Sequence, residues 1–157
     1  MQILTLYRRV ASMGADIMAH PVFMGTKKNR QHQHTNTYAH SICVAMMALW
    51  IVDRFHIKVE KQSLVRGCLL HDFFLYDWHI ARTRFHGFTH PTTALSNAKS
   101  YFPINDIEAD VIKHHMFPLT PHPPMTKEGW IITVADKLVS IREVFWVCRT
   151  KQKHVLV

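Results

Sequence analysis

The apolar residues of this chain recur at intervals of three and four residues, and this spacing constrains the fold more than any other feature. The most apolar stretch, Ile42–Val52, reads ICVAMMALWIV. It predicts a buried helix, because it is about half of the roughly 20 residues that a bilayer span needs. A second helix is predicted by a stripe with helical spacing: Trp130, Val134, Leu138, Ile141 and Phe145. No convincing alternation of apolar and polar residues indicates a sheet, so we expect an all-α protein.

Capping residues and prolines set the expected helix boundaries. We expect five to six or more helices, over about residues 2–12, 37–55, 61–73, 89 onward, 106–114 and 127–149. Thr35 or Asn36 caps the second of these, and Asn105 with Glu108 has the spacing of a capping box. Pro91 falls in the first turn of the fourth, where its missing N–H costs little. The polar stretch Gly25–Gln33 is predicted to be a loop.

Length and composition indicate one globular domain over residues 1–157, with 48% apolar and 19% charged residues. The three cysteines are odd in number and widely spaced, so they fit neither a disulfide framework nor a cysteine-based zinc site. The N-terminal residues lack the order of a signal peptide, basic and then apolar. We therefore expect a cytoplasmic protein without a membrane span; the sequence leaves the oligomeric state open.

The formal net charge of +8 favours anionic ligands. Charge alone does not separate nucleic acid from a nucleotide or a sugar phosphate. Because no recognised nucleic-acid-binding motif accompanies the charge, we expect a small phosphorylated molecule rather than nucleic acid as the partner.

Histidine is unusually abundant, with 13 copies. It is the commonest metal ligand in proteins, so its placement matters. An ionisable residue inside an apolar helix should be paired or coordinated, which draws attention to His40 and Asp136. A His-Asp pair alone is common by chance and is compatible with a surface or capping role. The ordered set is far less expected from chance: His40, His71, Asp72, His90, His114, His115 and Asp136.

The segments YAHSICVA, VRGCLLHD, GFTHP, IKHH and VADKL, in this order, resemble the motif blocks of the HD superfamily of metal-dependent phosphohydrolases. The resemblance covers about residues 32–146 and implies a compact helical bundle. It implies one ion held by His40, His71, Asp72 and Asp136, with Asp72 bridging to a second ion. The histidines that match the second ion are His90, His114 and His115. Ligands of this kind suit one or two divalent ions of Fe, Mn, Co, Ni or Zn.

The implied reaction is hydrolysis of a phosphate ester or anhydride of a small molecule, a nucleotide in our interpretation, by a metal-bound hydroxide. Asp72 and Asp77 are the expected catalytic residues. Asp77 would donate a proton to the leaving group, although a loop or capping role suits it too. Three basic residues lie near ligand positions and could contact phosphate or remain solvated surface charges: Arg84, Lys113 and Lys137.

Two differences from the motifs of the superfamily narrow the range of substrates that we expect. Asn36 stands where some cyclic-dinucleotide phosphodiesterases of the superfamily place a ligating glutamate, and their GYP motif is missing. We therefore do not expect a cyclic-di-GMP phosphodiesterase. Two other functions stay open: a regulatory HD module that binds a nucleotide or metal without hydrolysis, and a basic nucleic-acid-binding protein whose histidines are incidental.

Overall fold

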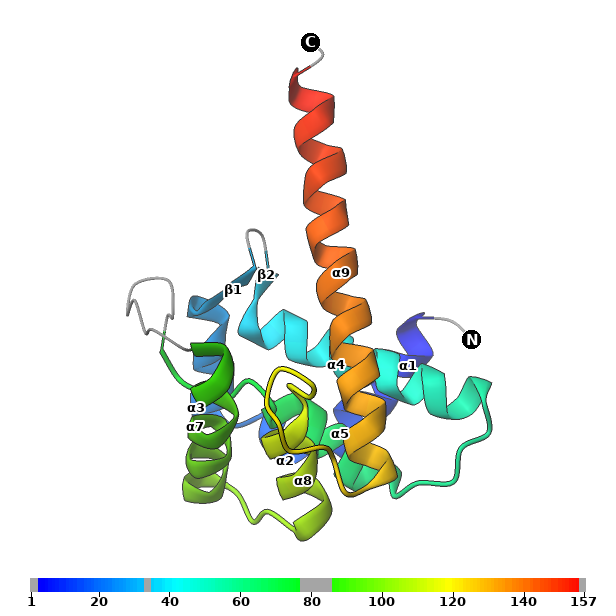
Figure 1. Ribbon diagram of the computed structural model, residues 1–157, viewed down its shortest axis with the longest axis vertical. Coiled ribbons are helices and arrows are strands. Elements are labelled where there is room, and N and C mark those ends of the chain that lie inside the picture. The colour runs from blue at the N-terminus through cyan, green and yellow to red at the C-terminus, as the bar shows by residue number, and fades with distance from the viewer. Residues whose placement is uncertain (1–2, 33–34, 77–85, 156–157) are drawn as a thin grey trace.

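The protein is a bundle of helices (Figure 1) in which α4 and α5 pack against each other, α4 also against α9 and α5 also against α8. This computed structural model describes residues 3–32, 35–76 and 86–155. The helices in order are α1 (Ile3–Met13), α2 (Ala15–Met18), α3 (Pro21–Gly25), the 3₁₀ helix η1 (Thr26–Lys28), α4 (Thr37–Arg54), α5 (Lys61–Leu70), α7 (His86–Tyr101), α8 (Asp106–His114) and α9 (Lys127–Val155). The expected all-α class is confirmed.

The segment before α4 differs from the prediction. We predicted a loop over residues 25–33, whereas β1 (Arg30–His32) pairs antiparallel with β2 (Thr35–Asn36). The short helices α2 and α3 were also missed. Elements of this length show no measurable periodicity, so the sequence carries no pattern for them. The two-stranded ladder leads directly into α4, where the backbone N–H of Thr37 donates to the carbonyl of Asn29 at 3.0 Å.

The predicted caps at two helix starts are confirmed. The side chain of Asn36 accepts a hydrogen bond from the backbone N–H of Ala39 at 2.9 Å. At the start of α8, Asn105 and Glu108 form the reciprocal bonds of a capping box. Each cap satisfies N–H groups that have no partner inside the helix.

Other helix boundaries were wrong. Helix α5 ends at Leu70 rather than at residue 73, and α9 continues to Val155 rather than to residue 149. Helix α7 begins at His86, so Pro91 lies inside the helix rather than in its first turn. The additional first turn of α7 packs closely, because a Cβ atom on Gly87 would lie 3.0 Å from Leu119 Cδ2.

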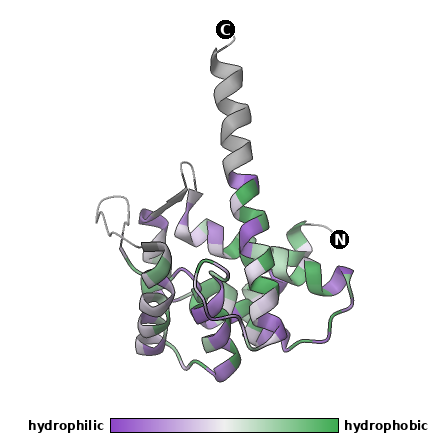
Figure 2. Cartoon of the chain, viewed as in Figure 1, coloured by the Kyte–Doolittle hydropathy of each residue, from purple (hydrophilic) through white to green (hydrophobic). Residues whose placement is uncertain are grey.

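The hydrophobic core lies where α4 and α5 pack against each other and against α8 and α9. Gly67 on α5 allows α8 to approach closely, because a Cβ atom there would lie 2.5 Å from Val111 Cγ1. Figure 2 shows hydrophobic and hydrophilic residues mixed along the helices, as expected when each buries one face. Within the described residues, no helix combines the length and the apolar character needed to cross a membrane.

Helix α9 buries a different face from the one its most conspicuous stripe suggests. The core face consists of Ile131, Ile132, Ala135 and Val139. The large residues Trp130, Val134, Leu138 and Ile141 are 44–52% exposed. Between the two faces, Asp136 is buried and directed toward the ends of α4 and α5. Helix α9 therefore contributes both core packing and a carboxylate at the candidate site.

Candidate metal centre

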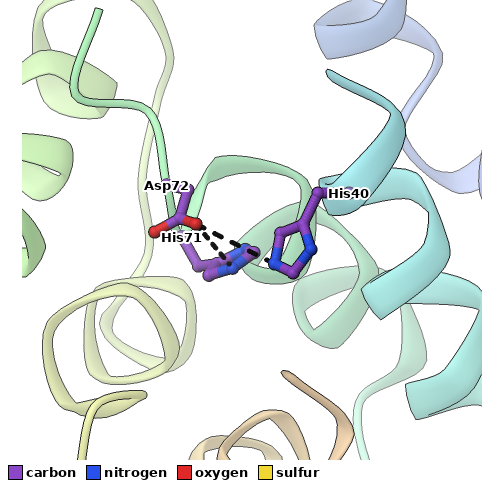
Figure 3. A group of neighbouring side chains, drawn as sticks. All are labelled: His40, His71 and Asp72. Carbon is purple, nitrogen blue, oxygen red and sulfur yellow. Dashed lines mark ion pairs between the residues drawn. The ribbon is translucent and has the colours of Figure 1, made fainter. Parts of the chain in front are cut away.

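The first part of the candidate centre is formed by side chains from α4, the end of α5 and α9. His40 lies in the first turn of α4 and His71 caps the C-terminus of α5; both are fully buried. The Nε2 atom of His40 lies 3.1 Å from Asp136 Oδ1 and 3.9 Å from Asp72 Oδ2. The Nε2 atom of His71 lies 3.4 Å from Asp72 Oδ2 and 3.8 Å from Asp136 Oδ1. Figure 3 shows how His40, His71 and Asp72 converge.

The second part shares Asp72 and adds histidines from α7 and α8. His90 Nε2 lies 3.2 Å, and His115 Nε2 3.7 Å, from Asp72 Oδ1. The two Nε2 atoms lie 3.0 Å apart. Asp72 thus directs Oδ2 toward one pair of histidines and Oδ1 toward the other. Two sets of side chains have the spacing of metal ligands: His40, His71 and Asp72; and Asp72, His90 and His115.

Hydrogen bonds at the opposite ring nitrogens determine which atoms are available to an ion. Nδ1 of His71 lies 2.7 Å from the carbonyl oxygen of Cys68, and Nδ1 of His115 lies 2.8 Å from that of Ile112. A carbonyl only accepts, so both Nδ1 atoms carry the hydrogen and both Nε2 atoms hold the lone pair when the rings are neutral. Within the described residues, the buried Nε2 of His71 has no hydrogen-bond partner. The donor set therefore fits a divalent transition-metal ion.

Charge interactions keep both carboxylates ionised. Burial by itself would raise the pKa of Asp72, but the nearby His71 and His90 outweigh it and hold that pKa well below its usual range. Burial likewise opposes ionisation of Asp136, yet the hydrogen bond from His40 and the neighbouring His71 lower its pKa. Ionised carboxylates are the form that binds a cation.

The pKa values of the two histidines His40 and His115 are shifted in opposite directions. For His40, burial would lower the pKa, but hydrogen bonds to Asp136 and Glu143 prevail and raise it to about 10. For His115, burial and the neighbouring His71 and His90 lower the pKa to about 3, so its ring is neutral near pH 7. Glu143 was missed by the sequence analysis. Its signal was its position seven residues after Asp136, two helical turns further along one face of α9.

Most of the expected ligands meet here, but His114 does not join them. Its Nδ1 atom lies 2.7 Å from Asp110 Oδ1, one turn earlier on α8, and its side chain belongs to neither set. His114 and His115 are adjacent on a helix and therefore point about 100° apart, so one faces the centre and the other faces Asp110.

The charged residues that the sequence suggested as proton donor or phosphate contacts lie in different surroundings. Asp77 and Arg84 lie outside the described residues. Lys113 is exposed on α8. Lys137 is half-buried, and its Nζ donates to the backbone carbonyls of Phe117 at 2.8 Å and Thr133 at 3.2 Å. A third carbonyl, that of His115, lies 3.4 Å from the same Nζ. Lys137 thus fastens the turn that follows His115.

An all-helical bundle with histidines and aspartates gathered in a buried centre is the class of structure that the metal-dependent hydrolases of the HD superfamily share. The HD domain family model matches residues 37–141, which is more than half of the 157-residue chain. The chain belongs to the HD superfamily of metal-dependent phosphohydrolases, as its motif blocks predicted. Comparisons with curated proteins and with solved structures give no match.

Proposed function

We propose that this protein hydrolyses a phosphate ester or anhydride of a small molecule, with a nucleotide as the substrate class, and that one or two divalent ions bind at the centre. The observation that carries the proposal is the position of Asp72, whose two oxygens face separate histidine pairs. A carboxylate placed in this way would be able to offer one oxygen to each of two ions, and two-metal sites catalyse hydrolysis by stabilising both the attacking and the leaving oxygen.

The side chains have distinct parts in this proposal. His40, His71, Asp72 and Asp136 would hold one ion, and Asp72, His90 and His115 the other. Bound divalent ions activate water and offset the negative charge of phosphate oxygens. The protein keeps its own ligands fixed: the carbonyls of Cys68 and Ile112 orient two rings. Burial of these groups excludes competing solvent and strengthens electrostatic interactions.

The net charge of +8 supports an anionic substrate. Aromatic side chains also line the end of the centre near α7, where the rings of Phe74 and His90 lie 5.8 Å apart and those of Phe74 and Tyr76 5.1 Å apart. Tyr76 is only partly buried. A partly exposed aromatic ring beside a phosphate site is suited to stacking on a base, which favours a nucleotide.

The test is phosphate release from a panel of nucleotides, nucleotide sugars and simple phosphomonoesters. We expect release that a chelator stops and that added Mn²⁺, Co²⁺, Ni²⁺ or Fe²⁺ restores. Asp72→Ala should abolish both the activity and the bound metal, whereas Asp106→Asn, an exposed carboxylate at the start of α8, should change neither. Metal binding and nucleotide binding without any product would instead identify a regulatory module. Salt-dependent polynucleotide binding that a chelator does not affect would contradict the proposal outright.

A further inference from the structure

The carboxylate of Glu143 faces the side of His40 that points away from the metal centre. Its Oε2 and Oε1 atoms lie 3.2 and 3.3 Å from Nδ1 of His40. The His40 side chain is fully buried and that of Glu143 is 13% exposed. Glu143 lies beyond residues 37–141, where the HD domain model matches, so the family match assigns it no role.

His40 differs from the other buried histidines in how its ring can be oriented. His71 and His115 stand at the C-terminal ends of α5 and α8 and donate from Nδ1 to a carbonyl of their own helix. His40 stands near the start of α4. There the preceding turn offers no free helical carbonyl, so its Nδ1 needs an acceptor from another element, and α9 provides it.

Helix α9 contacts both nitrogens of this one ring. Asp136 and Glu143 are seven residues apart, which places them two turns apart on the same helical face. Asp136 Oδ1 lies 3.1 Å from Nε2, and Glu143 faces Nδ1. An ionised carboxylate only accepts, so Nδ1 carries a hydrogen toward Glu143. Nε2, which donates to Asp136 when no ion is bound, is then the nitrogen that would give up its proton to bind an ion.

The geometry points to Glu143 as a positioning residue for the metal centre: it holds Nδ1–H of His40 and so presents Nε2 to the ion shared with His71, Asp72 and Asp136. The inference rests on the proposed function, because it requires that a divalent ion binds there. A carboxylate behind a ligating histidine fixes the ring orientation and increases the basicity of the ligating nitrogen.

The test is a titration of the purified full-length protein with Zn²⁺ in competition with a chromophoric chelator. We expect Glu143→Ala to weaken the binding of the ion at His40 by about 10–100-fold. Glu143→Gln retains an acceptor oxygen but not the charge, so the loss should be less than about tenfold. Arg142→Ala, the exposed neighbour on α9, should bind Zn²⁺ as the unmodified protein does. The same titrations are repeated in a His115→Ala background, which lacks a ligand of the other ion. Weaker Zn²⁺ binding that persists in this background is then assigned to the ion at His40.

Unfolding in the presence of chelator separates positioning from a purely structural role. We expect Glu143→Gln to unfold at the same denaturant concentration as the unmodified protein while binding Zn²⁺ more weakly. Unchanged affinity in both variants would overturn the inference and leave the proposed function intact. The inference would also be overturned if Glu143→Gln and Glu143→Ala lost Zn²⁺ affinity equally and were destabilised equally. If the unmodified protein binds no Zn²⁺, Mn²⁺ or Co²⁺, the proposed function fails, and this inference fails with it.

Discussion

The adjacent residues His114 and His115 allow a matched test of the centre. His115→Ala removes one of the three candidate ligands of the second set, and His114→Ala removes a side chain bonded to Asp110. Structural zinc sites with four protein ligands bind with about 10–16 kcal/mol, so one ligand accounts for about 3 kcal/mol, or about a hundredfold in affinity. We expect His115→Ala to lower the metal content by one ion per chain and His114→Ala to leave it unchanged.

The free energy of unfolding should distinguish the two variants in the opposite way, with the larger loss in His114→Ala. In chelator, His114→Ala loses a hydrogen bond to a buried carboxylate and should be destabilised by about 1.5 kcal/mol. Elemental analysis after equilibration in a metal buffer and urea unfolding with chelator provide the two measurements, with circular dichroism to confirm helical content. Loss of an ion from His114→Ala, combined with full occupancy in His115→Ala, would refute the assignment of the second set.

Three further predictions concern the supports of the centre. The carboxylate of Asp110 accepts bonds from the backbone N–H and the hydroxyl of Thr126, at 2.9 and 2.6 Å. Burial alone would raise the pKa of Asp110, but these bonds hold it below the usual range of an aspartate, so the stabilisation is present above that range and lost as pH falls through the folded pKa. Urea unfolding should therefore show that the stability advantage of the unmodified protein over Asp110→Asn shrinks as pH falls below about 3.9, the ordinary pKa of an aspartate. Gly129→Ala should be destabilising, because its Cβ would lie 2.6 Å from Asp110 Oδ2, and a melting temperature equal to that of the unmodified protein would contradict the packing described. Lys137→Met keeps the chain length but removes the donor to Phe117; we expect a loss of about 1–3 kcal/mol in unfolding free energy.

The long helices were predictable because each carries its own local signals. The apolar run within α4 has no charged residue, and the capping box at Asn105 marks the start of α8. The short elements between α1 and α4 were not predictable, because a helix of four residues or a strand of two shows no period. Of these elements, η1, β1 and β2 pack against α4, and the bond from Thr37 to Asn29 ties the same segment to the start of that helix.

The convergence of the candidate ligands was predictable for a different reason. Buried histidines and carboxylates need partners, so the apolar surroundings of His40 and Asp136 indicated that these residues are paired or coordinated. Which of His114 and His115 would face the centre depends on the rotation of α8 at its last turn, and residue spacing does not determine that rotation. The contact between His40 and Glu143 joins residues 103 positions apart, so only the tertiary arrangement of α4 and α9 brings it about.

Helix α9 connects the two halves of the centre mechanically. Asp136 contacts His40, and the next residue, Lys137, holds the backbone carbonyls of the turn that carries His115. The helix then continues to Val155, and Figure 1 shows it projecting past the rest of the bundle. Because neighbouring residues of one helix contact both candidate ligand sets, a change in the position of α9 would alter both sets rather than either one alone.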